Sequence, residues 1–361
     1  MHVAIRSDAS ADIGSGHVMR CLALAGELQR NGAHVTMVSR AHSGHLAGFA
    51  TAAGCRVICL PSRLASPVGA TGKYASWLGV SQADDALQTL DALAALGGCD
   101  LLVVDHYGLD ARWEAAVRPQ AKRLMVIDDL ADRPHDADVL LDQNLYANMG
   151  ARYSGLVPFS CKELLGPGYA LLRPEFFLAR QNIRQRDGLI KRIFVFFGGS
   201  DATNETSKAL EALVALDLHG IEVDVVIGAA NRHHAAIAGL CARLPGARLH
   251  RQVSHMARLM AAADLALGAG GSTTWERCAL GLPALVVSVA ENQVAIANGV
   301  DETGAHRHLG LFSDVSAGQL AAAIEEVRGA PADLRKMSQF ALALVDARGC
   351  ERVAIVLKED I

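Results

Sequence analysis

The sequence predicts an α/β protein with two Rossmann-like lobes that face a central cleft. Short runs rich in leucine and β-branched residues alternate with helix-length amphipathic segments, a pattern typical of parallel sheets covered by helices. The pattern also begins twice, since HVAIRSDASADIGSGHVMRCLALAGEL and RIFVFFGGSDATNETSKALEAL each combine a strand, a polar turn with glycine and a helix. Two lobes suit the length, because 361 residues exceed the roughly 250–300 that one core accommodates.

The predicted strands form two groups separated by the polar stretch RQNIRQRDGLIK. The first group is HVAIR, HVTMVSR, CRVICL, LLVVD, RLMVIDD and DVLLD, and the second is KRIFVFF, EVDVVIG, ARLHRQV, DLALGAG and PALVVSV. We therefore expect an N-terminal lobe over residues 1–184 and a C-terminal lobe over residues 185–361. Ligands of open α/β sheets bind beyond the carboxyl ends of the strands, so the site is expected between the lobes.

Composition argues against several kinds of partner. The net charge is −4 at pH 7 and the 34 lysines and arginines are scattered, so no basic patch predicts a nucleic-acid partner. The most apolar stretches, such as LMAAADLALGAGG, fall short of the roughly 20 residues that span a membrane. The opening MHVAIRSD lacks the features of a signal peptide. We expect a cytoplasmic protein with a small-molecule substrate and no membrane partner, and the oligomeric state is not predicted.

Neither metal nor cofactor binding is predicted. The eight cysteines are far apart with no C-x-x-C pair, which favours free thiols over disulfides. The histidine pairs at 42 and 45, 233 and 234, and 306 and 308 lack companions at ligand spacing. The GSGHVM turn has no third glycine for G-x-G-x-x-G, and the chain has no G-K-[ST] loop.

The second-lobe stretch GAGGSTTWERCALGLP (268–283) is the best candidate for binding a diphosphate. Gly270 and Gly271 would let the backbone approach a ligand, and Ser272 or Thr273 would cap a helix whose first amides attract anions. Glu276 falls in the first turn, where it could accept from ribose hydroxyls. It could equally be the capping-box partner of Thr273.

Two further turns follow strands of the second lobe. FFGGSDATNE (196–205) includes Gly198, Gly199 and Ser200, which either contact the ligand or only form the turn, with Asn204 capping the next helix. AENQ (290–293) follows PALVVSV, and Asn292 and Gln293 could bind phosphate or sugar hydroxyls or could cap a helix. Gly199, Ser200, Asn292 and Gln293 are therefore kept as candidate substrate contacts.

His17, after the first strand, is the candidate catalytic residue. It would sit in the first turn of a helix, where the helix dipole opposes protonation and keeps the imidazole neutral. A neutral imidazole in a cleft can act as a general base, whereas the ordinary alternative is a capping or packing histidine. Gly16 would let the substrate approach, and Asp8 is a candidate substrate contact beside it.

Three other positions could belong to the same site. Two strands end at the same sheet edge, one in Asp105-His106-Tyr107 and the other in Asp128-Asp129. These residues could bind the sugar, orient His17 or satisfy loop amides. Arg173 in GPGYALLRPEF (166–176) could neutralise a diphosphate, or could form a surface salt bridge.

Longer motifs carry a resemblance to a known family. RSDASADIGSGHVMRCLALA, DHYGLD, GPGYALLRPEF, GGSDATN and AGGSTTWERCALGLPALVVSVAENQ together resemble the UDP-2,4-diacetamido-2,4,6-trideoxy-β-L-altropyranose hydrolases of pseudaminic acid biosynthesis. The resemblance covers residues 6 to about 350 and implies a GT-B-like fold, related to the transferase that adds GlcNAc to peptidoglycan lipid precursors.

The resemblance also implies a reaction and residues for it. The family releases UDP by metal-independent attack of water on the anomeric carbon with inversion, and its proton acceptor corresponds to His17. Its substrate-binding positions match Arg173 and Glu276, whereas sugar contacts within residues 62–80, from Tyr74 or Trp77, stay open. Whether the helices of residues 331–361 return to the first lobe also stays open.

The alternatives are a glycosyltransferase on the same scaffold and a non-catalytic sugar-nucleotide-binding protein. A transferase would release UDP only when an acceptor is present. A binding protein would hold the UDP-sugar without releasing UDP.

Overall fold

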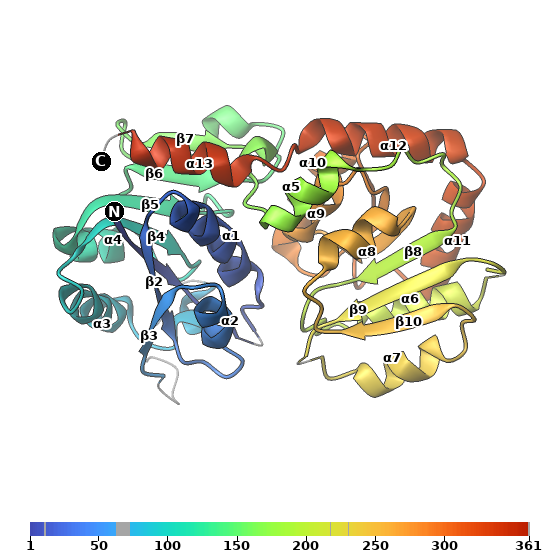
Figure 1. Ribbon diagram of the computed structural model, residues 1–361, viewed down its shortest axis with the longest axis horizontal. Coiled ribbons are helices and arrows are strands. Elements are labelled where there is room, and N and C mark those ends of the chain that lie inside the picture. The colour runs from blue at the N-terminus through green and yellow to red at the C-terminus, as the bar shows by residue number, and fades with distance from the viewer. Residues whose placement is uncertain (11, 63–72, 217, 230, 360–361) are drawn as a thin grey trace. The chain divides into compact units, whose positions relative to one another are not determined.

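The computed structural model describes residues 1–10, 12–62, 73–216, 218–229 and 231–359 (Figure 1). The chain divides into two compact units. The first unit comprises Met1–Asn144, Asn148–Arg173 and Gly349–Ile361, and the second comprises Leu145–Ala147 and Pro174–Arg348.

The first unit is built on a seven-stranded parallel sheet with the order β3-β2-β1-β4-β5-β6-β7. Its strands are β1 (His2–Ser7), β2 (His34–Arg40), β3 (Arg56–Leu60), β4 (Cys99–Asp105), β5 (Ala121–Ile127), β6 (Val139–Asp142) and β7 (Lys162–Leu165). The strand order reverses between β1 and β4, which is where ligands of such sheets bind.

Helices cover both faces of this sheet. Its helices are α1 (Gly16–Arg30), α2 (Ala47–Ala52), α3 (Gln82–Ala94), α4 (Ala111–Val117) and α13 (Gly349–Lys358). Alternate strand residues face opposite cores, since Val3 and Ile5 pack with α1 and α13 whereas Ala4 packs with α3 and α4. Trp113 on α4 is fully buried in the second of these cores.

The second unit repeats the plan with a six-stranded parallel sheet in the order β10-β9-β8-β11-β12-β13. Its strands are β8 (Arg192–Phe196), β9 (Glu222–Ile227), β10 (Ala247–Arg251), β11 (Leu265–Ala269), β12 (Ala284–Ser288) and β13 (Arg307–Leu311). Its helices are α5 (Pro174–Gln181), α6 (Glu205–Val214), α7 (His234–Cys241), α8 (Met256–Ala262), α9 (Thr273–Ala279), α10 (Glu291–Glu302), α11 (Ala317–Arg328) and α12 (Pro331–Leu344). Here the order reverses between β8 and β11.

The prediction of two parallel-sheet α/β lobes is confirmed, and two details of the organisation differ from expectation. The strands β7 and β13 were not predicted, because each lies at a sheet edge and is short and half-exposed, without a continuous apolar run. The units divide at Arg173 rather than near residue 184. The reason is that α5 packs against α8 and α9 of the second unit.

The last helix, whose packing the sequence left open, belongs to the first unit. Cys350, Val353 and Leu357 of α13 are buried with α1 in the core of that unit. Gly349 allows this packing, because a Cβ there would overlap the backbone of Ala170. All eight cysteines are free thiols, and six of them are buried.

Candidate active site

The first-unit site forms where β1 and β4 end side by side. Ser7 at the end of β1 is paired in register with Asp105 at the end of β4. The chain after β1 turns through Gly14, whose φ of +78° suits glycine, and enters α1 at Gly16. This path places His17 in the first turn of α1, next to the end of β4.

His17 and Asp105 form a buried pair. Nδ1 of His17 lies 2.5 Å from Oδ1 of Asp105, and the two residues are 8% and 0% exposed. Because the carboxylate can only accept, Nδ1 carries the hydrogen, and in the neutral imidazole the lone pair is then on Nε2. Among the described residues no group bonds to Nε2. The arrangement therefore leaves Nε2 able to accept a proton.

Arg20, one turn further along α1, holds the other side of Asp105. Its Nε and Nη2 donate to the two carboxylate oxygens of Asp105 at 2.7 and 2.8 Å. Its Nη1 donates to Asp129 at 2.7 and 2.9 Å, and Asp129 also accepts from the Tyr107 hydroxyl at 2.6 Å. Asp105, Asp129 and Arg20 thus form a buried network that fixes the carboxylate facing His17.

Charges within the network keep Asp105 ionised. Burial by itself raises the pKa of this carboxyl, but the charge of Arg20 and then that of His17 bring the pKa well below its ordinary value. The same carboxylates raise the pKa of the Arg20 guanidinium against the effect of burial. Burial, followed by the charge of Asp129, raises the pKa of the Tyr107 hydroxyl, so it stays a donor.

Aromatic rings surround the imidazole. The Tyr107 ring meets the His17 ring edge-on, with centroids 4.5 Å apart at 83°. Trp77 stacks on Tyr107 at 5.7 Å and 20°, and Tyr74 contacts both rings at 4.7 and 5.1 Å. Tyr74 and Trp77, left open by the sequence, therefore lie in this cluster, whereas residues 63–72 of the same stretch lie outside the described part.

The Asp8 side chain is buried and bonds to groups inside the first unit. Its carboxylate is 0% exposed and accepts from the Arg6 guanidinium at 2.5 and 2.8 Å and from the Arg40 amide at 2.6 Å. Arg6 and Arg40 also bind Asp85 on α3. The carboxylate of Asp8 is therefore not exposed for the substrate contact that the sequence predicts. Asp8 stabilises the turn after β1 instead.

Two of the strand-end residues satisfy neighbouring groups, which was their ordinary alternative. Asp128 accepts from the amides of Leu130 and Ala131 and from the Tyr153 hydroxyl. His106 accepts from the Gly108 amide at 2.9 Å, and burial lowers the pKa of its imidazole to about 4. Neither of these two contacts His17 in the way that Asp105 does.

The second-unit loop Gly270–Ser272 joins β11 to α9. Ser272 is the N-cap of α9 but makes no side-chain capping bond, and Glu276 lies in the first turn. Gly271, Ser272 and Thr273 are partly exposed. The N-cap position is thus held by Ser272, and Thr273 is the first residue of α9.

The AENQ segment begins α10 and contacts this loop. A Cβ at Gly271 would lie 3.4 Å from Nε2 of Gln293, whose Oε1 accepts from the Val289 amide at 3.1 Å. Asn292 is partly exposed one residue earlier. The structure thus brings together Gly271 and Gln293, two residues predicted separately from the sequence.

The loop after β8 is closed by a different residue from the one predicted. Asp201, with φ of +44°, accepts from the amides of Glu205 and Thr206 at the start of α6. Asn204 occupies the N-cap position with φ of +61° and makes no capping bond. Gly199 and Ser200 are partly exposed before it. Arg173 is the last residue of the first unit before the chain enters the second, and it is also partly exposed.

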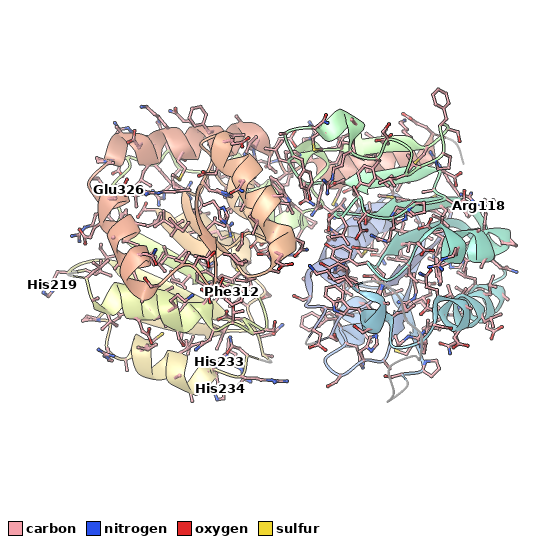
Figure 2. All side chains as sticks on the ribbon, turned by 180° about the vertical axis from the view of Figure 1, so that it is seen from behind. Arg118, His219, His233, His234, Phe312 and Glu326 are labelled. Carbon is pink, nitrogen blue, oxygen red and sulfur yellow. The ribbon has the colours of Figure 1, made fainter. Side chains whose placement is uncertain are left out.

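Two other features of the described residues are candidates for a second site. His233 and His234 lie at the start of α7 (Figure 2), and the described residues contain no group of three metal-ligating side chains.

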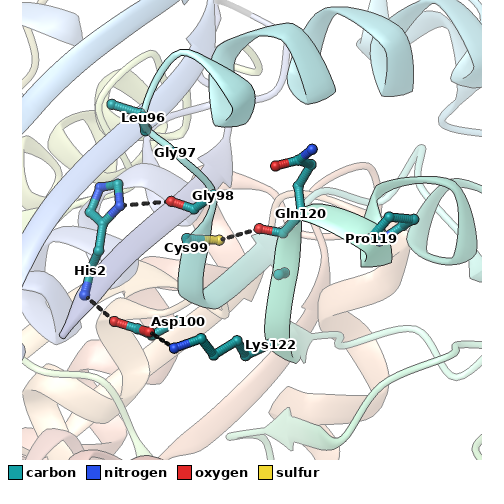
Figure 3. A pocket seen from close by; sticks show the side chains of 10 residues that line it. His2, Leu96, Gly97, Gly98, Cys99, Asp100, Pro119, Gln120 and Lys122 are labelled. Atoms are coloured by element: carbon teal, nitrogen blue, oxygen red, sulfur yellow. Dashed lines mark hydrogen bonds and ion pairs between the residues drawn. The ribbon is translucent and has the colours of Figure 1, made fainter.

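A cavity of about 620 Å³ lies at the amino ends of β1 and β4, around His2 and Asp100, whereas His17 lies at their carboxyl ends (Figure 3). Its ionisable groups are paired, since Lys122 and the His2 amide donate to Asp100 at 2.7 Å. No described helix is both long and apolar enough to span a membrane.

Three relatives match the chain in sequence, whereas no model of a known protein family matches it. An uncharacterized protein of Methanocaldococcus jannaschii is 24% identical over 299 residues, which are 81% of this chain and 57% of that protein. The spore coat polysaccharide biosynthesis protein SpsG of Bacillus subtilis is 26% identical over 262 residues, 72% of this chain and 76% of that protein. The UDP-2,4-diacetamido-2,4,6-trideoxy-β-L-altropyranose hydrolase of Campylobacter jejuni is 28% identical over 204 residues, 56% of this chain and 62% of that protein. The chain therefore spans less than two thirds of the length of the first and third relatives.

Solved structures match the whole chain. MurG of Acinetobacter baumannii superposes with a TM-score of 0.66 at 16% identity, covering 99% of both chains. The glycotransferase of kitacinnamycin gives 0.68 at 20% identity, covering 99% of this chain and 98% of that one. The spinosyn rhamnosyltransferase SpnG, complexed with thymidine diphosphate, gives 0.64 at 16% identity, covering 98% and 99%. These likenesses establish a fold of the GT-B type.

Proposed function

We propose that this protein hydrolyses UDP-2,4-diacetamido-2,4,6-trideoxy-β-L-altropyranose, releasing UDP with inversion at the anomeric carbon, as a step in pseudaminic acid biosynthesis. The observation that carries the proposal is the buried pair of His17 and Asp105, which leaves Nε2 of the imidazole able to accept a proton. The Campylobacter jejuni relative that bears the name of this reaction supports the choice of substrate.

The reaction requires one proton acceptor and stabilisation of the leaving group. Nε2 of His17 takes a proton from water as the water oxygen bonds to the anomeric carbon and the bond from that carbon to the diphosphate oxygen breaks. Asp105 holds Nδ1–H and stabilises the imidazolium that forms, which is the role of the carboxylate in a catalytic triad. UDP leaves as an anion, so its departing diphosphate oxygen needs no separate acid.

We assign the nucleotide to the second unit. The amides of Ser272 and Thr273 donate to the diphosphate, and Glu276 accepts from ribose hydroxyls. Gly271 lies against Gln293, and Asn292 precedes Gln293 in the chain. Gly199 and Ser200 follow β8, the strand next to β11. We assign all five to the nucleotide site. Arg173 contributes charge to the diphosphate, and Gly16 allows the substrate to approach His17. The structure of a thymidine diphosphate complex on the same fold supports a nucleotide ligand.

The test is hydrolysis in H₂¹⁸O without added metal, followed by mass spectrometry of the UDP. Attack at the anomeric carbon predicts unlabelled UDP, because the new oxygen enters the sugar. Label in the UDP phosphate would show attack at phosphorus and contradict the mechanism. A parallel incubation in ordinary water measures the background.

A glycosyltransferase is the second candidate, because the superposed structures include glycosyltransferases. The distinction is whether UDP release needs an acceptor. Release of one UDP per free sugar, at a rate that added acceptor sugars do not raise, supports hydrolysis. UDP release that occurs only with an acceptor supports transfer.

A further inference from the structure

The guanidinium of Arg277 on α9 forms hydrogen bonds with residues on both sides of the Gly270–Ser272 loop. Its Nη2 donates to the Ala269 carbonyl at 2.9 Å and to the Thr274 hydroxyl at 3.0 Å, and its Nη1 approaches the Thr273 hydroxyl at 3.2 Å. Ala269 is the last residue of β11, and Thr273 is the first residue of α9. The guanidinium therefore joins the strand end to the helix start and fixes the loop between them.

The guanidinium of Arg277 is buried without a carboxylate. Arg277 is 3% exposed, its Nε has no hydrogen-bond partner, and within the described ranges no acidic side chain forms an ion pair with it. Burial lowers the pKa of Arg277 to about 10, so the group stays charged at neutral pH. The charge of Glu276 acts on Arg277 without a direct ion pair, and a buried cation whose hydrogen-bond acceptors are all neutral keeps positive potential around it.

Three other buried arginines are compensated differently. Arg6 binds Asp8 and Asp85, and Arg20 binds Asp105 and Asp129. Arg186, like Arg277, lacks a carboxylate, but it donates to carbonyls at the carboxyl ends of α8 and α9, where helices attract cations. Arg277 is in the last turn of α9, but its guanidinium contacts Thr273 and Thr274 at the start of that helix, where no such attraction exists.

The strand next to Arg277 leaves room for this charge. Gly268 in β11 faces the guanidinium, and a Cβ there would lie 3.0 Å from Nη1 and 2.8 Å from the Phe196 carbonyl. Any other residue at position 268 would displace Arg277 or the neighbouring strand. The buried charge is thus accommodated by the local backbone.

We infer that Arg277 is a positioning residue for anion binding, which holds the 270–273 loop in place and supplies the positive charge that a nucleoside diphosphate on that loop compensates. This inference rests on the proposed function, since it takes the diphosphate to bind at this loop. It adds a second positive charge to the one that we assign to Arg173, because the loop itself carries no charged side chain before Glu276.

Titration calorimetry with UDP and with uridine separates the diphosphate contribution from that of the nucleoside. In the wild-type protein UDP is expected to bind more tightly than uridine. In Arg277→Gln the affinity for UDP falls by about tenfold or more, while uridine affinity is unchanged. Arg277→Lys keeps the charge and retains more of the UDP affinity than Arg277→Gln does.

Arg186→Gln is the matched control, because it removes a second buried arginine of the same unit without touching the loop. It is expected to lower stability but to keep the ratio of UDP to uridine affinity. Thr274→Val removes one acceptor of Arg277 with little change in shape. It gives a milder loss of UDP affinity even if Arg277→Gln does not fold.

Two results would overturn the inference. A ratio of UDP to uridine affinity that is the same in folded Arg277→Gln, or in Thr274→Val, as in the wild type contradicts the role of Arg277 alone. Equal affinity of the wild type for UDP and uridine contradicts both this role and the proposed placement of the diphosphate.

Discussion

Nδ1 of His17 lies 2.5 Å from Oδ1 of Asp105, although 88 residues separate the two in the chain. Pairing of β1 with β4 brings them together, because Ser7 and Asp105 are partners in register and His17 follows shortly after β1. An imidazole oriented by a buried carboxylate presents its second nitrogen as a base. The predictions below begin from this pair.

Replacing His17 by glutamine is expected to lower kcat for UDP release by about 10²–10⁴-fold, because the general base is lost. The affinity for UDP should stay the same, since the nucleotide is assigned to the other unit. Steady-state kinetics and calorimetry measure the two quantities. His106→Gln is a control at the same strand end, since His106 accepts from Gly108 instead of facing Asp105. A kcat in His17→Gln equal to that of the wild type would show that His17 has no role in catalysis.

Asp105→Asn tests the orientation of the imidazole. The amide no longer requires a hydrogen on Nδ1, and the wrong tautomer lowers kcat by up to about 10⁴-fold with little change in KM. Asp129→Asn is the matched control, because Asp129 also binds Arg20 but does not contact His17. Both variants lose stability through Arg20. A kcat that falls equally in both would show that the effect of Asp105 on His17 is only structural.

His306 predicts a pH dependence of stability. Burial, then the charge of Arg277, lowers the pKa of its imidazole to about 3. The unfolded chain, with an ordinary histidine pKa near 6.5, then binds one more proton than the folded chain below that pH. Stability is therefore present above pH 6.5 and falls by about 1.4 kcal/mol per pH unit below it, for this group.

His306→Gln should reduce that slope between pH 5 and 6.5, as measured by urea unfolding. Comparison with the wild type cancels groups common to both proteins. One of these is Asp142, whose pKa burial raises to about 6 and whose contribution has the opposite sign. An unchanged slope in the variant would contradict the burial of a neutral His306.

Gly349→Ala tests the return of α13 to the first unit. The added methyl group would overlap the Ala170 backbone, and such overpacking typically lowers stability by about 1–3 kcal/mol. Gly26→Ala in α1 is the control, since its Cβ would meet no atom within 4 Å and helical alanine is favoured by about 0.5–1 kcal/mol. Chemical unfolding of both variants measures the difference. Equal stability of the two variants would contradict the close packing of Gly349.

The strands that carry the site were predictable because each contains a continuous apolar run. The buried strands β1, β4, β8 and β11 read as continuous runs, whereas the edge strands β7 and β13 lack such a run and were missed. His17 and the 270–273 loop were predicted for a related reason. A turn that directly follows such a strand must lie at the carboxyl edge of a parallel sheet.

The sequence by itself determined the two parallel-sheet lobes and the turns at which chemistry is expected, since apolar periodicity and glycine positions are local properties. Only the tertiary structure decided which polar residues meet. It selected Asp105 rather than Asp128 as the partner of His17, paired Asp8 with Arg6, and bonded the Arg277 guanidinium to the carbonyl at the end of β11. The physical reason is that strand pairing and side-chain packing join residues far apart in the chain, and these decide which buried charges are compensated.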